Sequence, residues 1–180
     1  MSLDEAAVQR LIDEAEIRSV SMRFARGVDR LDWELVRSCF HDDAVDDHGF
    51  YVGDVDGMIE VLKQIVPADI ATTHFLGNQE YDFTASDVAY VETSVITRHR
   101  QPPRDGRPLV DGFGFGQYSD RFEKRNNEWR IAHRLVVHQP SRIDPVAEDI
   151  PFHPDCYRAT RGDEASRGIR RPETLARQKQ

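Results

Sequence analysis

The amino-acid sequence predicts an α+β domain, in which about three N-terminal helices pack on one face of a mainly antiparallel sheet. Two observations support this fold class. Helical periodicity fills the N-terminal part of the chain up to Pro67, and strand-like segments then follow one another from Thr72 to His138. Helices first and consecutive strands afterwards are typical of this architecture.

The first helix is predicted from apolar residues that recur at three- and four-residue intervals. It is expected to end near Gly27, a residue suited to a helix C-terminus. A second helix follows with Asp32 as its N-cap, so we expect Asp29 between the two helices, beside any cavity that they cover. A third helix spans residues 54–66 and is ended by Pro67. The apolar face of the first helix comprises Leu11, Ile12, Ala15, Ile17, Val20, Met22 and Phe24.

Four strands are predicted after the helices. Alternation and β-branched residues are clearest in the second of them, which contains the run Val-Glu-Thr-Ser-Val-Ile-Thr. Ser86-Asp87 and Asn126-Asn127 are typical turn sequences, and the second turn is expected to close a hairpin. A further short hairpin is predicted at residues 48–51. The four strands cover residues 72–83, 88–98, 109–125 and 128–138.

Length and composition indicate one domain followed by a tail. A chain of 180 residues suffices for one compact domain, which we place at residues 1–140. Residues 141–180 are rich in proline, arginine and acidic side chains and contain few apolar ones. We expect them to form an extended tail that wraps a neighbouring subunit or stays mobile.

Charge and sorting signals argue against several function classes. The net charge of -8 disfavours a nucleic-acid partner, which usually binds a basic face. No apolar stretch approaches the roughly 20 residues that span a bilayer, and no signal-peptide pattern is found. Cys39 and Cys156 lie far apart and form no metal-like cluster, although their spacing leaves a disulfide open. We therefore expect a cytoplasmic protein with free thiols and no membrane contact.

The run Thr-Thr-His-Phe-Leu-Gly-Asn, centred on His74, is the strongest candidate for chemistry. Histidine exchanges a proton near neutral pH, and a carboxylate such as Asp29 on one ring nitrogen would leave the other nitrogen free to accept a proton. The residues alone also allow a histidine at a sheet margin and an unrelated aspartate beside a helix. Strand alternation places His74, Leu76, Asn78 and Glu80 on one side and Phe75, Gly77, Gln79 and Tyr81 on the other.

The segment Gly-Phe-Gly-Phe-Gly at residues 112–116 lies inside a strand pattern with no helix after it, which argues against phosphate binding. Its glycines form a stripe without side chains on the same face as Tyr118. Such a stripe permits sharp sheet curvature or leaves room for a bulky ligand. Phe113 and Phe115 are expected to face the opposite side, which is a candidate subunit interface.

An acidic segment at residues 41–48 invites a metal site. An acidic loop beside a strand is the commoner explanation, and we predict no metal. The segment contains His41, Asp42, Asp43, Asp46, Asp47 and His48.

Three motifs occur in the order helix end, first strand and closing hairpin. They are Gly27-Val28-Asp29-Arg30, then Thr73-His74-Phe75-Leu76-Gly77-Asn78, then Tyr118-x-x-x-Phe122-Glu123 with Glu128-Trp129-Arg130-Ile131. Together with the order of the elements they resemble the SnoaL-like family of the nuclear-transport-factor-2-like superfamily, over residues 13–139. Within it, the most similar motifs are those of scytalone dehydratase, lindane dehydrochlorinase and bile-acid 7α-dehydratase. The resemblance implies a cone-shaped, strongly curved sheet around a pocket.

The resemblance also implies catalytic roles. His74 would remove a proton from carbon, Asp29 would orient His74, and a leaving group would depart without a metal or an organic cofactor. His99 would protonate the leaving group, or it is a solvated histidine at a strand end. Arg134 and His138, four residues apart on one strand face, would stabilise an oxyanion or leaving group, or they are surface charges.

The implied pocket would take a small hydrophobic substrate. Phe24 and Val28 stand where related dehydratases carry tyrosines, and Gly116 and Tyr118 replace a serine and an asparagine of scytalone dehydratase. Tyr51 or Tyr118 would then have to supply a hydroxyl to a substrate carbonyl. The residues expected to bind substrate are Phe24, Tyr51, Gly114, Gly116, Tyr118 and His138.

The sequence therefore predicts a cofactor-independent lyase that performs a dehydratase-like elimination on a small apolar cyclic substrate, such as a steroid or polyketide. Two other functions stay open. One is a ketosteroid-isomerase-like isomerase, which would use similar groups. The other is a non-catalytic ligand-binding or structural subunit resembling the β subunit of aromatic-ring dioxygenases. Because one open sheet face usually packs on another subunit, we expect a homo-oligomer, a dimer or a trimer.

Overall fold

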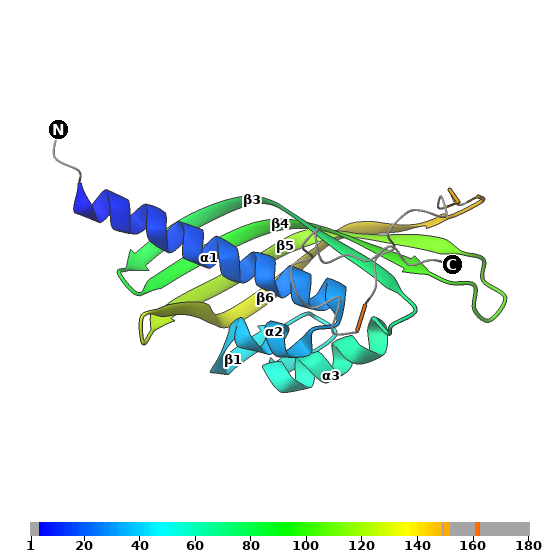
Figure 1. Ribbon diagram of the computed structural model, residues 1–180, viewed down its shortest axis with the longest axis horizontal. Coiled ribbons are helices and arrows are strands. Elements are labelled where there is room, and N and C mark those ends of the chain that lie inside the picture. The colour runs from blue at the N-terminus through cyan, green and yellow to red at the C-terminus, as the bar shows by residue number, and fades with distance from the viewer. Residues whose placement is uncertain (1–3, 149, 152–160, 163–180) are drawn as a thin grey trace, which may run out of the picture.

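The computed structural model describes residues 4–148, 150–151 and 161–162. Its elements follow the order α1, α2, β1, β2, α3 and β3 to β6 (Figure 1). The helices are α1 (Glu5–Arg30), α2 (Trp33–Ser38) and α3 (Val55–Ile65), and the strands are β1 (Phe40–Asp47), β2 (Val52–Asp54), β3 (Ala71–Ala85), β4 (Val88–Gln101), β5 (Val110–Arg125) and β6 (Glu128–Pro145).

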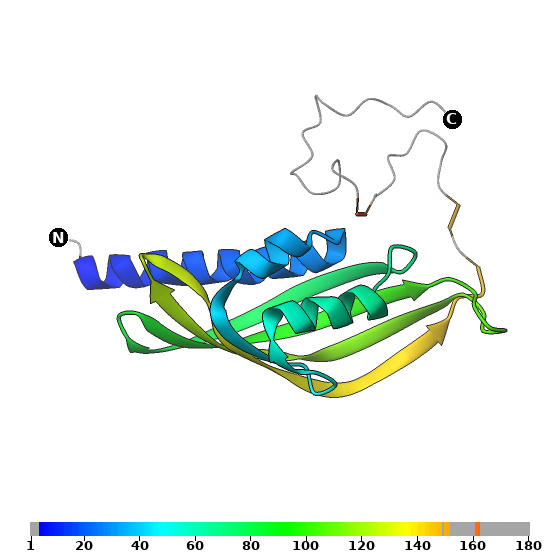
Figure 2. The same ribbon diagram turned by 90° about the horizontal axis from the view of Figure 1, so that it is seen from below.

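The strands of the described chain form one six-stranded sheet in the order β2-β1-β6-β5-β4-β3. Neighbouring strands are antiparallel except for β1 and β6, which run parallel. The sheet is strongly curved but not closed, and the helices lie on its concave side (Figure 2). The predicted α+β class with a curved, mainly antiparallel sheet and about three helices is thereby confirmed, and the shape is consistent with a cone fold.

Helix α1 does not end near Gly27 as predicted but continues for almost one more turn, to residue 30. Leu31 then ends it in the left-handed conformation (φ 57°) and bonds back to carbonyls of the last turn. Gly27 serves the packing of two helices instead, because a Cβ there would lie 2.7 Å from Cγ2 of Val36 on α2. Asp29 therefore belongs to the last turn of α1, and helix geometry determines the direction of its carboxylate.

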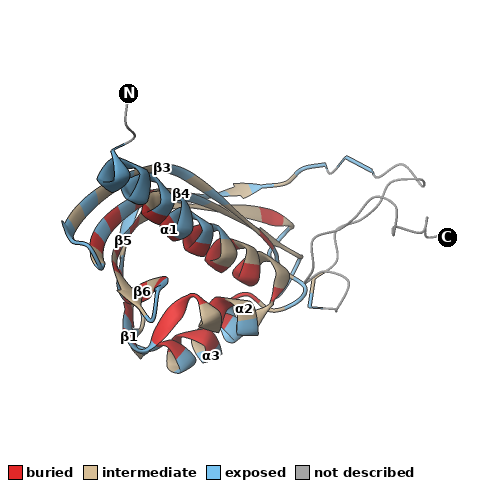
Figure 3. Ribbon diagram, turned by 60° about the vertical axis from the view of Figure 1, so that its left-hand side comes forward, coloured by how far each residue is buried: buried red, intermediate tan, exposed pale blue. Residues whose placement is uncertain are grey.

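Fewer residues of α1 are buried than its apolar pattern predicts. Its buried side is turned toward the sheet (Figure 3), and Ile17, Val20 and Phe24 are almost completely covered. Met22, two positions from both Val20 and Phe24, points to the other side of the helix and is exposed. The predicted face was wrong for the exposed residues Leu11, Ile12, Ala15 and Met22.

A β-bulge corrects the predicted alternation of β3. The register shifts between Leu76 and Gln79, where two residues of β3 face one residue of β4. Beyond the bulge the side-chain directions reverse. Gln79 therefore lies on the same face as His74 and donates to Oγ1 of Thr93 (3.0 Å), although the uniform alternation placed Gln79 and His74 on opposite sides.

Strands β1 and β2 form the predicted short hairpin, in which the N–H of His48 donates to the carbonyl of Tyr51 (2.9 Å). Gly49 adopts φ 75° in this turn, a conformation that favours glycine. Strand β1 begins at Phe40, two residues after the end of α2 at Ser38. The acidic segment that follows it is therefore a strand through Asp47 and not a loop.

The C-terminal boundary of the sheet also differs from the prediction. Strand β6 runs to Pro145, past His138 and into the predicted tail. Most of the tail, with Cys156, lies outside the described residues, so its wrapping or mobility stays a prediction.

Cys39 is buried and has a free thiol. None of the helices in the described ranges is long and apolar enough to cross a membrane, and the cytoplasmic location stays a prediction.

Candidate active site

Asp29 and His74 are in direct contact through two hydrogen bonds. Nδ1 of His74 donates to Oδ1 of Asp29 (2.6 Å), and the backbone N–H of His74 donates to Oδ2 (2.9 Å). Both carboxylate oxygens thus bind one residue, which holds both the strand position and the ring orientation of that histidine. Because Nδ1 carries the hydrogen, Nε2 is the nitrogen that can accept a proton, and it bonds to no other residue of the described chain.

His74 lines a cavity of about 150 Å³ on the concave side of the sheet. Four histidines from different strands or turns border this cavity, namely His48, His74, His99 and His138. Most of the other walls are apolar, so the cavity suits a largely apolar ligand. The remaining lining residues are Val28, Phe50, Leu62, Ile65, Val66, Val95, Thr97, Gly114, Phe115, Gly116, Tyr118 and Val136.

His99 lies beside His74 in the cavity wall. The two rings meet edge to face, with centroids 6.4 Å apart. Burial, helped by the neighbouring His74, lowers the pKa of His99 to about 4. The imidazole is therefore neutral at neutral pH, and it is not the solvated histidine that a strand end allows. It can hydrogen-bond a ligand but lacks the second proton of an imidazolium acid.

Arg134 and Phe24 lie in the core and not in the cavity wall, which contradicts the places predicted for them. Arg134 is fully buried, and its Nε and Nη2 each donate to Asp120 at 2.7 Å. Its guanidinium carbon lies 4.2 Å from the centroid of the Phe24 ring and 4.1 Å from that of Tyr118. A guanidinium held between two rings and a carboxylate is neither a surface charge nor able to reach a ligand.

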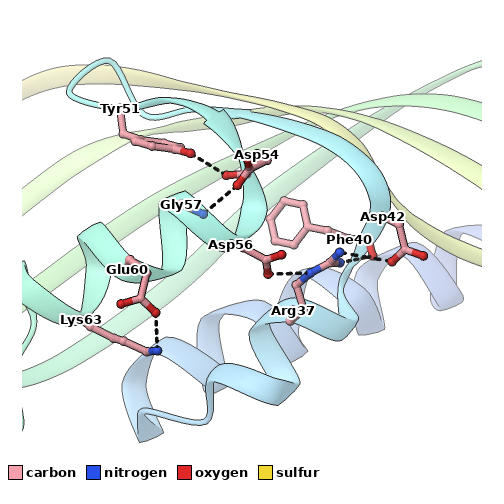
Figure 4. Close-up of polar contacts among 9 residues, drawn as sticks. All are labelled: Arg37, Phe40, Asp42, Tyr51, Asp54, Asp56, Gly57, Glu60 and Lys63. Atoms are coloured by element: carbon pink, nitrogen blue, oxygen red, sulfur yellow. Dashed lines mark hydrogen bonds and ion pairs between the residues drawn. The ribbon is translucent and has the colours of Figure 1, made fainter.

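Tyr51 likewise lies outside the cavity wall. Its hydroxyl donates to the carbonyl of Asp54 (2.9 Å) at the start of α3 (Figure 4). A Cβ at Gly53 or Gly57 would collide with the tyrosine side chain, so these glycines give it space. Tyr51 thus packs over a helix start. Of the two tyrosines expected to offer a hydroxyl, Tyr118 is the one that borders the cavity, and burial raises its pKa, so it stays a neutral donor.

Gly114 and Gly116 border the cavity, but the space beside them is used by the protein itself. A Cβ at Gly114 would lie 2.6 Å from Oγ1 of Thr97, and a Cβ at Gly116 would collide with the carbonyl of Val137. The register of β5 and β6 shifts nearby, which fits a role in sheet curvature. Phe115, which lies between these glycines and was predicted to face away, is also among the residues that border the cavity.

A second Asp–His pair, absent from the predicted site residues, lies at the same cavity. Asp46 on β1 is fully buried, and its Oδ1 accepts a hydrogen bond from Nδ1 of His48. The one signal in the sequence was the spacing of two between Asp46 and His48, which places both side chains on one face of an extended segment. Among the residues that the structure describes, no group of three or more His, Cys, Asp or Glu side chains is arranged around a metal position.

A described fragment of the C-terminal region lies against the end of α1. Nε of Arg161 donates to the carbonyl of Asp29 (2.7 Å), and Nη2 donates to Oγ1 of Thr72 (2.8 Å). The N–H of Gly162 donates to the carbonyl of Arg30 (3.0 Å). The fragment therefore satisfies carbonyls of the last helical turn and places a positive charge beside Asp29.

Comparisons with solved structures show the same fold in enzymes and in proteins without a known role. A protein from Novosphingobium aromaticivorans DSM 12444 that is proposed to be a scytalone dehydratase is 20% identical, with 80% of this chain and 99% of that chain covered and a TM-score of 0.68. The dehydrochlorinase LinA-type3 from Novosphingobium barchaimii LL02, which acts on hexachlorocyclohexane, is 17% identical, with 81% and 99% covered and a TM-score of 0.69. A Mycobacterium tuberculosis protein of unknown function is 20% identical, with 74% and 75% covered and a TM-score of 0.62.

The family comparison is more specific than these structural likenesses. No curated protein matches the chain. The family model described as SnoaL-like domain matches residues 9–135, which is most of the chain and includes all the elements up to the middle of β6. The chain therefore belongs to the SnoaL-like domain family.

Proposed function

We propose that the protein is a cofactor-independent lyase that removes a proton from carbon with His74 and expels a leaving group, as in a dehydration. The observation that carries this proposal is the double contact between Asp29 and His74, which leaves Nε2 of His74 without a partner among the described residues, beside an apolar cavity. A proton on carbon is weakly acidic, so its removal needs a base of fixed position in a water-poor site. Membership of the family and the fold shared with a dehydrochlorinase support this reaction class.

Each polar residue of the cavity then has a role that its surroundings permit. Asp29 keeps the proton of His74 on Nδ1 and stabilises the imidazolium that forms when Nε2 takes the substrate proton. Tyr118 and the neutral His99 are donors for an oxygen of the substrate, where negative charge develops. Phe24 and Arg134 support this wall from behind, because both pack against the ring of Tyr118.

The cavity favours a small cyclic apolar substrate such as a steroid or an aromatic polyketide. Its apolar residues come from several elements, among them Leu62 of α3, Val95 of β4 and Phe50 of the turn before β2. A flat or gently curved ring system would contact these walls while a few polar groups meet the histidines.

The test is to screen purified protein against a panel of hydroxylated steroids and polyketides and then to compare variants on any substrate found. His74→Gln and Asp29→Asn should each lower turnover by roughly 10²- to 10⁴-fold, with folding checked by circular dichroism. His133→Gln, an exposed histidine on β6, is the matched control and should keep full activity. Undiminished turnover by His74→Gln would reject the base.

Product analysis separates the lyase from its alternatives. Loss of water or another leaving group from the substrate supports the lyase, whereas a product of unchanged mass indicates an isomerase. Tight binding of the panel without any chemical change indicates a ligand-binding subunit.

We also propose that a second copy of the chain covers part of the convex sheet face. Phe75 and Ile96 lie opposite each other in the β3–β4 ladder, and both side chains are exposed. Leu135 and Val137 are exposed apolar residues of β6. Light scattering after gel filtration should show a dimer or trimer, and Phe75→Lys should weaken it; a wild-type monomer at every concentration would reject the proposal.

A further inference from the structure

A cluster of buried charges lies behind the cavity wall where β1, β6 and β5 are adjacent. Asp46, Asp120 and Arg134 are 0%, 2% and 0% exposed. Arg134 is the register partner of Asp46 on one side and of Asp120 on the other. The guanidinium therefore belongs to a row that crosses three strands, with a carboxylate from each neighbouring strand.

The hydrogen bonds in this row are unevenly shared. Arg134 donates hydrogen bonds from Nε and Nη2 to Asp120, while its Nη1 is buried without a partner in the described chain. Oδ2 of Asp46 is also buried and unpartnered there. Asp46 is thus held by one hydrogen bond, which Nδ1 of His48 donates to its Oδ1.

Charge balance gives this arrangement a consequence for His48. Buried charges persist when opposite charges compensate them. With both aspartates ionised, two carboxylates and one guanidinium leave one negative charge over in the row. The four side chains become neutral as a group when His48 carries protons on both ring nitrogens.

We propose that His48, held as an imidazolium by Asp46, is the proton donor of the reaction and the counterpart of His74. This inference rests on the elimination proposed above. The Nδ1 proton of His48 is bound by Asp46, and its Nε2 has no hydrogen-bond partner in the described chain, so the second proton is available to a ligand in the cavity that His48 lines. The neutral His99 and the enclosed Arg134 cannot supply that proton.

The groups that face His48 come from three elements and a turn. Asp46 is on β1, which ends just before His48, Asp120 and Arg134 lie behind it on β5 and β6, and His138 on β6 donates through Nε2 to the carbonyl of His48 (3.0 Å). The ring of Phe50 lies 5.5 Å away between centroids and covers it from the turn. His48 is thereby held in place on the side of the cavity that β1 and β6 form.

The proposed step uses both histidines at once. Nε2 of His74 takes the proton from carbon, and the electron pair of that C–H bond forms the new C=C bond. The bond from the adjacent carbon to the hydroxyl breaks, its electron pair stays on oxygen, and Nε2 of His48 gives its proton to that oxygen. The products are the alkene and water, with His74 protonated and His48 neutral. Proton exchange with solvent restores both residues.

The first test is spectroscopic and needs no substrate. Nitrogen-15 spectra of histidine-labelled wild-type protein at neutral pH should show two protonated ring nitrogens for His48 and a proton on Nδ1 alone for His74. Asp46→Asn should return His48 to a neutral form, while His133→Gln, the control, should change neither signal. A neutral His48 in the wild-type protein overturns the proposal.

The second test separates the donor from the base with two probes. Dehydration of 4-hydroxy-4-phenylbutan-2-one needs a proton on the leaving hydroxyl, whereas ring opening of 5-nitrobenzisoxazole releases a stable phenolate and mainly needs a base. His48→Gln should lower the rate with the hydroxyketone about 100-fold and the rate with the benzisoxazole much less. Equal losses on both probes overturn the donor role. Full activity of His74→Gln on both probes rejects the proposed function, and the nitrogen-15 spectra still decide the state of His48.

Discussion

The two Asp–His pairs of this cavity have the same residues and opposite surroundings. In both, Nδ1 of the histidine donates to an aspartate oxygen, and in both the histidine lines the cavity. The Asp29 side chain is 19% exposed, and its two oxygens both accept hydrogen bonds from His74. The Asp46 side chain is fully buried and has one oxygen without a partner in the described chain.

The charges beside the two aspartates favour different protonation states of the two histidines. Arg161 lies beside Asp29, so that pair is balanced when the histidine is neutral and able to act as a base. Arg134 lies beside Asp46 but is engaged by Asp120, so this second pair is balanced when the histidine is charged and able to act as an acid. Two identical motifs can thus take complementary roles because nearby charges, and not the motif, determine which protonation state is stable.

The largest effect on this comparison should come from Arg134→Ala. Removing the guanidinium leaves the carboxylates of Asp46 and Asp120 buried without it, and loss of one partner of a buried ion pair typically costs about 3–5 kcal/mol. Urea unfolding measures the loss. Arg130→Ala, on the same strand with a surface ion pair to Glu128, should cost at most about 1 kcal/mol. Equal losses in the two variants would show that the row is not a buried charge cluster.

Acidification should weaken the fold through His99. The pKa of this imidazole is about 4 in the folded protein against an ordinary 6.5, because burial disfavours its charged form. At pH values between these two pKa values, the unfolded chain binds a proton at His99 and the folded chain does not. The free energy of unfolding therefore falls as the pH drops through this range. The full shift corresponds to at most about 3 kcal/mol. Urea unfolding of His99→Gln should therefore show a smaller loss of unfolding free energy than the wild-type protein between neutral pH and pH values near the lower pKa. An unchanged dependence of the unfolding free energy on pH would contradict the lowered pKa of His99.

Gly49→Ala should affect the second pair alone. Gly49 follows His48 with φ 75°, where a side chain costs about 1–2 kcal/mol. Thermal or urea unfolding gives the loss, and the nitrogen-15 signal of His48 should shift while that of His74 stays. Gly77→Ala, where a Cβ would meet only ordinary contacts, is the control. A shift of both histidine signals would mean that the two pairs are coupled.

The smallest effect is expected from Arg161→Ala. Its hydrogen bonds to backbone carbonyls and to Thr72 lie at the margin of the fold, and hydrogen bonds of this kind contribute about 1 kcal/mol each. Urea unfolding should show a loss of that order, together with lower turnover because Asp29 loses its neighbouring cation. Arg142→Ala, an exposed ion pair on β6, is the control and should have little effect on either property.

Local sequence determined much of the fold. Asp32 does cap α2, since its Oδ1 accepts from the N–H of Leu35 (3.1 Å). The Asn126-Asn127 turn has φ 52° and 62°, as asparagine tolerates. Such features depend on a few neighbouring residues, and for that reason short patterns predict them.

Predictions failed where two distant elements meet. The end of α1 was misplaced because Gly27 is a glycine that allows Val36 of α2 to pack closely, and it does not terminate its own helix. The face of Gln79 was reversed because a bulge is set by the pairing of β3 with β4. Arg134 was placed at the ligand because its partner, Asp120, comes from another strand.

By itself, the sequence determined the fold class, the order of the helices and most strands, and the histidine and aspartate of the first pair as candidates. The tertiary structure decided which of the candidate residues reach the cavity, and it joined the buried Asp46 to His48, which lines the same cavity as His74. The physical reason is that periodicity records which side of an element is buried, whereas protonation and access depend on charges and side chains contributed by other strands.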